Sequence, residues 1–169
     1  LVVKPAREGS TIGISIVRTP EELAAAAQTA LGHDDSILVE DFIPGAEVTI
    51  GVLAGDALPI IQVVPKGGFY DYHAKYTVGQ TEYLLPAPLE DAPQERLQQA
   101  AVAAYRALGC AGAARIDFMV RDRDFFCLEV NTIPGMTETR LLPKAARHAG
   151  ISFTELVLRI LDGAGTGKG

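Results

Sequence analysis

The sequence is poor in three features: an excess of basic side chains, cysteine, and long uninterrupted apolar runs. Its 169 residues include 15 Lys and Arg against 21 Asp and Glu, which gives a formal net charge of -6. An acidic chain without a Lys/Arg stripe argues against a nucleic-acid surface. No apolar stretch reaches the length of a membrane-spanning helix, and no signal-peptide pattern opens the chain. We therefore expect neither nucleic acid nor a membrane as a partner.

The two cysteines, Cys110 and Cys127, both lie in apolar sequence surroundings. We interpret them as reduced core thiols rather than as a disulfide or metal ligands, which fits a cytoplasmic protein. Hydrophobic residues make up 48% of the chain, enough to bury a core as one globular domain or two small lobes. The chain starts with Leu1 inside an apolar run and not with methionine, so we expect a fragment of a longer protein.

The stretch of residues 112–143 contains two segments that we expect to pair as a hairpin. Apolar and polar residues alternate over residues 113–120, which predicts a strand with one apolar and one charged face. The alternation resumes over residues 125–131 and predicts a second strand. The charged face of the first strand carries Arg115, Asp117 and Met119, and the second strand is predicted to present Cys127, Glu129 and Asn131 on one face and Phe126, Leu128 and Val130 on the other.

The register of this hairpin decides which polar side chains meet. With a three-residue loop over 122–124, Asp117 lies opposite Glu129 and Arg115 lies opposite Asn131, all on one face. A two- or four-residue loop needs a bulge to restore that register. Two carboxylates and an amide oxygen repel each other unless a cation lies between them, and Mg²⁺ suits such oxygen ligands. A solvated face on which Arg115 neutralises Asp117 is the alternative.

Four further segments have features of functional loops. Residues 7–13 form a polar, glycine-bounded loop that could cover phosphates or be an exposed hairpin tip. Glu40 and Glu47 flank a Pro-Gly turn, where they could hold a nucleoside or be ordinary rim charges. Residues 65–88 lack a clear period and contain several tyrosines, so we interpret them as one long functional loop. The tight loop after the hairpin contains Gly135, which can bring backbone N–H groups close to a ligand.

The remaining segments are expected to be scaffold. A capping box of Thr19 and Glu22 opens one helix, and Ser152 with Glu155 opens another. The helix over residues 93–108 is predicted to turn Leu97, Ala101, Ala104 and Leu108 inward. Together, the scaffold strands and helices are predicted over residues 1–4, 14–17, 19–32, 37–41, 48–53, 58–64, 93–108, 143–149 and 152–162.

Several long motifs, in the same order, resemble D-alanine–D-alanine ligase of the ATP-grasp superfamily. These motifs are VVKPAREGSTIG, ILVEDFIPGAE, FYDYHAKYTVGQTEYLLPAPL, AARIDFMV and LEVNTIPGMT. The resemblance covers almost the whole chain. It implies an α+β ATP-grasp fold, with mostly antiparallel sheets and flanking helices in two lobes that hold the nucleotide between them. It also implies that the N-terminal domain of the family and the start of its central domain are absent.

The resemblance further implies a domain organisation and an activity. Residues 1–169 would form an ATP-grasp domain, with a phosphate-loop lobe over about residues 1–43, a catalytic lobe over about residues 44–162 and a flexible tail over residues 163–169. The implied reaction joins two D-alanines for peptidoglycan, with ATP, through a D-alanyl phosphate and a tetrahedral intermediate. The implied enzyme is a cytoplasmic carbon–nitrogen ligase, a homodimer when complete, with two Mg²⁺ ions that Mn²⁺ could replace.

Two alternatives to this activity remain. The chain could belong to another ATP-grasp carboxylate–amine ligase, which uses a different D- or L-amino acid or D-lactate. In its truncated form it could instead be a nucleotide-binding fragment without activity. We expect the isolated fragment to be inactive, because the residues that bind the ammonium group of the first D-alanine lie in the absent domain.

The resemblance also assigns roles to single residues. ATP would be bound by Lys4, Glu8, Ser10, Glu40, Ile43, Glu47, Phe69, Lys75 and Met119. The metal ions would be bound by Asp117, Glu129 and Asn131. The implied catalytic residues are Arg115, Ser10, Tyr76 and Gly135.

Within these sets, the implied tasks differ. Arg115 and the N–H of Gly135 would stabilise the oxyanion, and Lys75 would meet the transferred phosphate. Ser10 would link the phosphate loop to Tyr76. A tyrosine at this position resembles the dipeptide ligases more than the lactate-using relatives, which tend to have histidine there.

Arg140 departs from the family pattern. It stands where the family usually has a serine that binds the terminal carboxylate of the second substrate. Together with Leu141, Arg140 would meet that carboxylate, or it could instead form an ion pair with Glu138.

Overall fold

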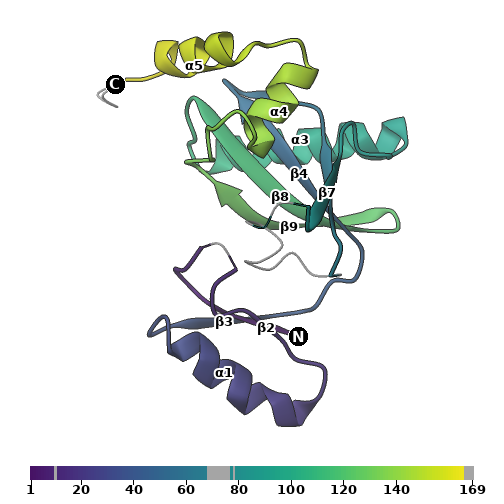
Figure 1. Ribbon diagram of the computed structural model, residues 1–169, viewed down its shortest axis with the longest axis vertical. Coiled ribbons are helices and arrows are strands. Elements are labelled where there is room, and N and C mark those ends of the chain that lie inside the picture. Colours follow the sequence, from purple (N-terminus) through teal and green to yellow (C-terminus); the bar gives the residue numbers. More distant parts are fainter. Residues whose placement is uncertain (10, 68–76, 78, 166–169) are drawn as a thin grey trace. The chain divides into compact units, whose positions relative to one another are not determined.

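The computed structural model describes residues 1–9, 11–67, 77 and 79–165. Its internal contacts divide the chain into two compact units (Figure 1). The first contains Leu1–Pro44 and Val64–Glu82, and the second contains Gly45–Val63 and Tyr83–Gly169.

The first unit is a three-stranded sheet with one helix packed on it. The strand order is β2-β1-β3, and β1 is antiparallel to both neighbours. The elements are β1 (Val2–Pro5), β2 (Ser15–Ile16), the 3₁₀ helix η1 (Pro20–Glu22), α1 (Leu23–Leu31) and β3 (Ile37–Glu40). Val3 of β1 is buried with Ala26 and Ala30 of α1. Because side chains alternate along a strand, Lys4 lies on the sheet face away from α1.

The predicted helix over residues 19–32 begins with the 3₁₀ turn of η1 and continues as α1. The Glu22 carboxylate accepts hydrogen bonds from the backbone N–H groups of Arg18 at 2.7 Å and Thr19 at 3.4 Å. Both bonds lower the pKa of Glu22, and the bond from Arg18 has the larger effect. The acidic half of the predicted capping box therefore satisfies backbone donors that the first turn leaves without helical partners.

The larger sheet, most of whose residues belong to the second unit, has the strand order β7-β6-β4-β8-β9, and β5 pairs with β4. Its strands are β4 (Ala46–Leu53), β5 (Asp56–Ala57), β6 (Ile61–Pro65), β7 (Thr81–Leu84), β8 (Ala113–Arg121) and β9 (Asp124–Asn131). The pairs β4–β5, β4–β6, β4–β8 and β8–β9 are antiparallel. Antiparallel sheets with separate helices are the predicted α+β arrangement. The prediction of one long loop over residues 65–88 is wrong for residues 81–84, which pair with β6 as β7.

Helices cover the two faces of the larger sheet unequally (Figure 1). Helix α3 (Asp91–Ala107) packs on one face, in a core that includes Val48, Ile50, Leu97, Ala101, Ile116 and Phe118. Helices α4 (Leu141–His148) and α5 (Phe153–Asp162) pack on the other face at one end, through Leu53, Leu58, Ile61, Ala113, Leu142 and Leu156. Among the described residues, no helix combines the length and apolar character needed to cross a bilayer.

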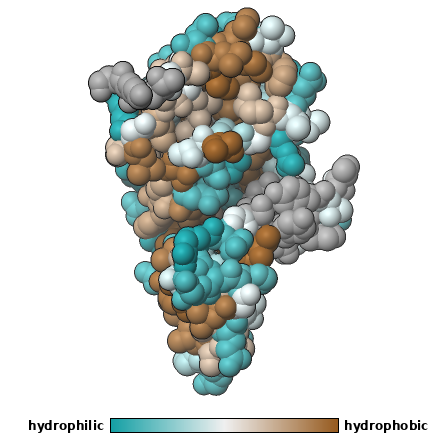
Figure 2. All heavy atoms as spheres, turned by 90° about the vertical axis from the view of Figure 1, so that its left-hand side faces the viewer, coloured by the Kyte–Doolittle hydropathy of each residue, from teal (hydrophilic) through white to brown (hydrophobic). Residues whose placement is uncertain are grey.

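Helix α3 has the predicted inward face except at its last turn. Leu97 and Ala101 are buried, but Leu108 is 63% exposed, and Tyr105 is buried instead. Residues 97, 101 and 105 follow the helical repeat, whereas Leu108 is already the C-cap residue. Leu108, Leu158 and Leu161 are exposed apolar residues of this unit, and Figure 2 shows apolar surface in the region of α5.

Gly51 allows helix α4 to approach the larger sheet. A Cβ atom on Gly51 would lie 2.5 Å from Leu142 Cδ1 and 3.0 Å from Leu58 Cδ1. Gly51 lies opposite Arg115 in the register of β4 and β8. Close packing at Gly51 therefore marks the boundary between the apolar end of this face and the polar positions that follow.

Candidate active site

A row of polar side chains crosses three neighbouring strands of the larger sheet. The register places Asp117 of β8 opposite Thr49 of β4 on one side and opposite Glu129 of β9 on the other. Arg115 lies opposite Asn131, as predicted. Opposed residues of an antiparallel pair point to the same face, so these five side chains share one face. We call Thr49, Arg115, Asp117, Glu129 and Asn131 the polar row.

The hairpin reaches this register through a shorter turn than the three residues predicted. The turn contains two residues, 122–123, and the first of them has a φ of 56°. A bulge in β9 compensates, because Asp117 pairs with Glu129 while the next residue of β8, Phe118, pairs with Cys127. A two-residue turn with a bulge is the alternative that the sequence predicts for the same register, and it is confirmed.

The bulge also changes the faces predicted at the start of β9. Phe125 packs on the apolar side, with its ring edge-on to Phe118 and the ring centroids 5.9 Å apart. Phe126 lies opposite Met119, on the face of the polar row. The prediction that Phe126 shares the apolar face of Val130 is therefore wrong, because the alternation of β9 shifts by one residue at the bulge.

Asp117 is the centre of the polar row and is only 7% exposed. Its Oδ1 accepts hydrogen bonds from Thr49 Oγ1 at 2.5 Å and from Arg115 Nε at 3.0 Å. Its Oδ2 accepts from Arg115 Nη2 at 2.8 Å and from Asn131 Nδ2 at 3.1 Å. A buried carboxylate requires such partners, and the two bonds from one guanidinium fix its orientation. The ion pair that the sequence predicts as the alternative to a metal site is thus present.

Asn131 joins the two carboxylates of the polar row. Its Nδ2 donates to Asp117 Oδ2 at 3.1 Å and to Glu129 Oε1 at 3.2 Å. Rotation of the amide would present Oδ1 at the same place. Two carboxylates and one amide oxygen form a hard donor set that leaves positions for water and phosphate, so these residues fit Mg²⁺. In the described part of the chain, no three His, Cys, Asp or Glu side chains converge, and the third oxygen donor that the polar row offers is the amide of Asn131.

Thr49 is a site residue that reasoning from the sequence misses. It is 3% exposed and stands within the run VTIGVL, where it resembles a core position. Its partner Asp117 lies 68 residues away in the sequence. The signal that could have identified Thr49 is its place opposite Asp117, which requires the β4–β8 register.

Two residues that are predicted to bind the nucleotide lie beside the polar row. Glu47 of β4 lies opposite Met119 of β8, two pairs along from Thr49 and Asp117 and therefore on the same face, and both side chains are half-buried. The chain enters β4 through Gly45, which has a φ of 153°. A Cβ atom there would lie 2.0 Å from a backbone oxygen of β8, so only glycine permits this entry.

The first unit contains a separate group of residues that are predicted to bind the nucleotide. Lys4 Nζ lies 2.8 Å from Glu40 Oε2, and both side chains are partly exposed on the sheet face away from α1. Ile43 is half-buried, and Glu8 is exposed in the loop after β1. The structure therefore brings Lys4 and Glu40 together within this unit.

Gly135 and Arg140 lie against each other in the segment between β9 and α4. A Cβ atom on Gly135 would lie 3.2 Å from Arg140 Cγ and 3.6 Å from its Nε. Arg140 is the N-cap residue of α4, which starts at Leu141. Glu138, the other predicted partner of Arg140, has its carboxylate 3.7 Å from the guanidinium of Arg147. Gly135, which is predicted to bind the oxyanion, and Arg140, which is predicted to bind the carboxylate of the second substrate, are thus neighbours.

Four predicted site residues and part of the tail lie outside the described residues. These are Ser10, Phe69, Lys75 and Tyr76, together with residues 166–169. The predicted link between Ser10 and Tyr76 therefore remains a prediction.

The two cysteines differ in exposure. Cys110 is half-buried, but Cys127 is exposed, so the prediction of two core thiols is wrong for Cys127. Both thiols are free. Partial burial, followed by the negative charges of Asp117 and Glu129, raises the pKa of the Cys127 thiol. A thiol with a raised pKa is a weak nucleophile and a weak metal ligand at neutral pH.

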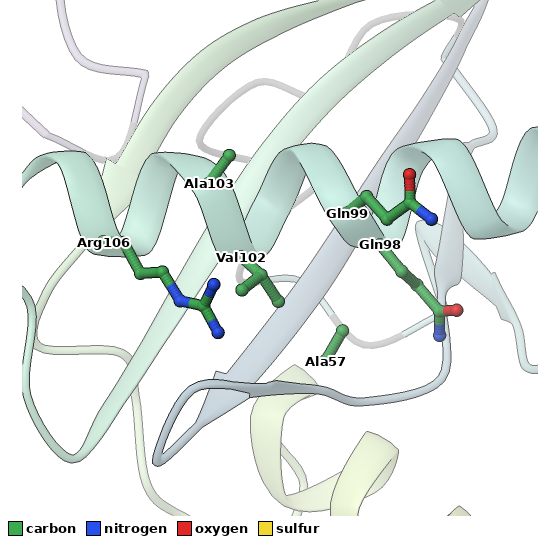
Figure 3. A pocket seen from close by; sticks show the side chains of 6 residues that line it. All are labelled: Ala57, Gln98, Gln99, Val102, Ala103 and Arg106. Carbon is green, nitrogen blue, oxygen red and sulfur yellow. The ribbon is translucent and has the colours of Figure 1, made fainter.

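A surface hollow of about 350 Å³ lies away from the polar row, between α3 and the segment that contains β5 (Figure 3). Its lining consists of Ala57, Gln98, Gln99, Val102, Ala103 and Arg106. None of these six is a predicted site residue. Helix α3 packs on the sheet face opposite to the polar row, so this hollow is not the candidate active site.

Solved structures with the same architecture define the class of fold. D-alanine–D-alanine ligase from Bacillus anthracis complexed with ATP superimposes with a TM-score of 0.81 at 34% identity, over 96% of this chain and 51% of that chain. VanG D-Ala:D-Ser ligase from Enterococcus faecalis gives a TM-score of 0.82 at 35% identity, over 95% of this chain and 48% of that chain. The predicted ATP-grasp fold is confirmed.

The chain belongs to the family described as D-ala D-ala ligase C-terminus, whose model matches residues 1–162. It is 69% identical over 168 residues to D-alanine–D-alanine ligase of Syntrophotalea carbinolica, and 51% identical over 165 residues to that of Citrifermentans bemidjiense. These matches cover 99% and 97% of this chain, but 55% and 54% of the relatives. The chain thus spans about half the length of the relatives that it matches.

Proposed function

We propose that this chain is the C-terminal catalytic part of an ATP-dependent D-alanine–D-alanine ligase. The observation that carries this proposal is the polar row, in which two carboxylates and an amide converge beside an arginine. The relatives at 69% and 51% identity, both named D-alanine–D-alanine ligase, support the same activity. The product would be the D-alanyl-D-alanine dipeptide used for peptidoglycan.

Asp117, Glu129 and Asn131 would hold the two Mg²⁺ ions, for which Mn²⁺ could substitute. When bound, such ions supply positive charge that offsets the charge of the transferring phosphoryl group. Thr49 and Arg115 would keep the Asp117 carboxylate in place through their hydrogen bonds to it. Residues that orient a ligand in this way contribute strongly to metal affinity.

ATP would be bound by residues of a phosphate-loop lobe over about residues 1–43 and residues of a catalytic lobe over about residues 44–162. Lys4, Glu8, Ser10 and Lys75 would contact its phosphates. The base and ribose would be contacted by Glu40, Ile43, Glu47, Phe69 and Met119. The resemblance of these positions to the family motifs supports this assignment, and the solved relative from Bacillus anthracis is described as complexed with ATP.

The proposed reaction has two steps. A carboxylate oxygen of the first D-alanine attacks the γ-phosphorus of ATP, so that ADP leaves and a D-alanyl phosphate forms. The amine of the second D-alanine then attacks the acyl carbon, and phosphate leaves from a tetrahedral intermediate. The Arg115 guanidinium and the Gly135 N–H would stabilise the negative oxygen of this intermediate, and Ser10 with Tyr76 would support the loops around it. Loss of one such donor typically slows a reaction about 100-fold or more.

Arg140 and Leu141 would receive the terminal carboxylate of the second substrate. The contact between Arg140 and Gly135 supports this role, because it brings a cation beside the backbone that would bind the oxyanion. A D-serine acceptor is the second candidate, since a solved relative at 35% identity is named D-Ala:D-Ser ligase. The complete ligase would be a cytoplasmic homodimer, and these 169 residues alone would be inactive.

Phosphate release from ATP by the complete ligase tests this function. We expect release that requires D-alanine, and a loss of about 100-fold or more in the Asp117→Asn variant, which removes one ligand charge at constant shape. Arg159→Gln on α5 is the matched control and should retain full activity. Parallel assays with D-serine, D-lactate and L-alanine compare the alternatives. Release that is independent of D-alanine, or faster with L-alanine, would contradict the proposal.

A further inference from the structure

The loop over residues 6–13 is fixed at both of its ends in the first unit. At its start, the backbone N–H of Ala6 donates to Ser36 O at 3.0 Å. At its end, Gly13 has a φ of 71°, and a Cβ atom there would lie 2.7 Å from His33 Cδ2 and 2.9 Å from Pro5 Cγ. Both ends therefore lie against residues at or next to the segment 33–36, which connects α1 to β3.

Arg7 strengthens this attachment through the carboxylate of Asp34. The backbone N–H of Arg7 donates to Asp34 Oδ2 at 2.8 Å, its Nε to the same oxygen at 3.3 Å, and its Nη2 to Asp34 Oδ1 at 2.6 Å. Nη2 also contacts Asp35. The Asp34 carboxylate also accepts a hydrogen bond from the backbone N–H of Ser36, at 3.2 Å. The Asp34 side chain thus binds the backbone of the loop, at Arg7, and the backbone of the connecting segment, at Ser36. We call this arrangement the Arg7–Asp34 clamp.

The two partners of the clamp differ in exposure. The Asp34 side chain is 5% exposed, whereas that of Arg7 is 66% exposed. The hydrogen bond from Arg7, which is the largest cause, keeps the pKa of Asp34 well below its usual range. The Asp34 carboxylate therefore stays charged throughout the pH range in which enzymes of this kind are assayed.

An ion pair whose cation is largely exposed, like Arg7 here, contributes little to folding stability by itself. The effect of the clamp lies instead in the conformational freedom of the loop. Each residue that becomes ordered when a ligand binds reduces affinity, because its backbone entropy is lost at that moment. A loop that is anchored before the ligand arrives loses less entropy on binding.

We propose that Arg7 and Asp34 are positioning residues, which hold the start of the loop after β1, residues 6–9, so that the backbone there is ready to bind the phosphates of ATP. This inference rests on the proposed function, in which Glu8 and the residues after it cover those phosphates. Arg7 and Asp34 act through the loop and do not themselves take part in the reaction.

Steady-state kinetics of the complete ligase test the clamp. For Asp34→Asn and Arg7→Met we expect the KM for ATP to rise about tenfold, which corresponds to roughly one residue's worth of backbone ordering. The kcat and the KM for D-alanine should change by less than about twofold, whereas loss of a catalytic group would lower kcat. Arg7→Lys, which keeps the charge but not the paired bonds, should restore part of the ATP affinity.

Hydrogen exchange of the same proteins measures the loop directly. We expect faster exchange over residues 6–13 in Asp34→Asn, and unchanged exchange in strands β8 and β9. Arg159→Gln, which removes the exposed ion pair with Glu155 on α5, is the matched control and should alter neither exchange in the loop nor the KM for ATP. If Asp34→Asn left loop exchange unchanged, or quickened it without raising the KM for ATP, the proposal would be overturned.

Failure of the proposed function gives a different result. It appears in the unmodified enzyme, as an absence of D-alanine-dependent phosphate release. Equilibrium binding of ADP with Mg²⁺ then judges the clamp, and the same tenfold weakening is expected in Asp34→Asn. Equal ADP affinity in the variant and the unmodified protein would reject the clamp whatever the reaction is.

Discussion

The two faces of strands β4 and β8 are made by alternate residues of the same chain segments, and both contain buried side chains. On the face under α3, Ile50, Ile116 and Phe118 are at most 1% exposed and pack without polar contacts to one another. On the other face, Thr49 and Asp117 are 3% and 7% exposed, but each depends on named hydrogen-bond partners. The buried residues under α3 are therefore stabilised by non-directional packing, whereas Thr49 and Asp117 are stabilised by directional hydrogen bonds.

This difference shows where each face is sensitive. Apolar packing loses stability in proportion to the volume removed, and neighbouring side chains can partly compensate. A hydrogen-bonded carboxylate loses its position when one donor is removed, even if the fold is retained. Among the described residues, no buried side-chain nitrogen or oxygen lacks a hydrogen-bond partner, so the buried polar atoms of this face all have one.

The largest expected effect on stability is on the apolar face. Phe118→Ala should lower the free energy of unfolding by about 3–5 kcal/mol, because it removes a fully buried ring that contacts Phe125. Urea denaturation measures this change. Phe118→Leu is the milder control and should lose clearly less. A loss below about 1 kcal/mol for Phe118→Ala would show that this face does not depend on close packing.

On the polar face, Thr49→Val should change metal binding more than stability. The variant keeps the shape of the side chain but removes the hydroxyl that donates to Asp117 Oδ1 at 2.5 Å. We expect Mg²⁺ affinity, measured by calorimetry in the presence of ADP, to fall about 10- to 100-fold. The free energy of unfolding should change by about 1 kcal/mol.

Ile50→Val is the matched control for this experiment, because Ile50 follows Thr49 in β4 and points to the opposite face. It should lower the free energy of unfolding by about 0.5–1.5 kcal/mol and leave Mg²⁺ affinity unchanged. Equal Mg²⁺ affinities in Thr49→Val and Ile50→Val would remove the distinction between the two faces.

The smallest expected effect is at Tyr105 of α3, which packs in the core against the apolar face. Its hydroxyl donates to Gly112 O at 3.3 Å, and burial raises its pKa. The neutral hydroxyl is therefore favoured by folding, and its contribution is present below a pH of about 10 and lost as the pH rises through the raised pKa. Tyr105→Phe should lower the free energy of unfolding by about 1 kcal/mol at neutral pH.

Urea denaturation at pH 8 and at higher pH checks this prediction. The difference in stability between the unmodified protein and Tyr105→Phe should shrink as the pH rises above about 10, because only the unmodified protein has a hydroxyl to ionise. A difference that stayed constant would show that burial of this hydroxyl has no effect on its ionisation.

Much of the fold and part of the site follow from local patterns. The helix starts at Thr19 and Ser152 are encoded within four residues, and Ser152 Oγ accepts from the backbone N–H of Glu155 at 3.2 Å, as predicted. The alternation over residues 113–120 predicts the strand and its charged face. The pairing of Asp117 with Glu129 follows because both arms of a hairpin are close in sequence.

The errors arise where strand pairing, a helix end or a bulge departs from the simple local pattern. Strand β7 exists because it pairs with β6, not because residues 81–84 have a strand pattern of their own. Leu108 was expected inside because its spacing matches the helix, but α3 ends before it can face the sheet. Phe126 changes faces because of the bulge, which the alternation of residue types does not show.

The sequence by itself determined most of the elements and the oxygen-rich hairpin with Asp117, Glu129 and Asn131, because these depend on local periodicity and short-range register. It indicated the α+β class through the resemblance of its motifs to a known family. Only the tertiary structure decided that Thr49 completes the polar row, and that Arg7 and Asp34 hold the base of a loop. Those partners are 68 and 27 residues apart in the chain. Which distant side chains meet depends on how strands and connections pack, and no local pattern contains that information.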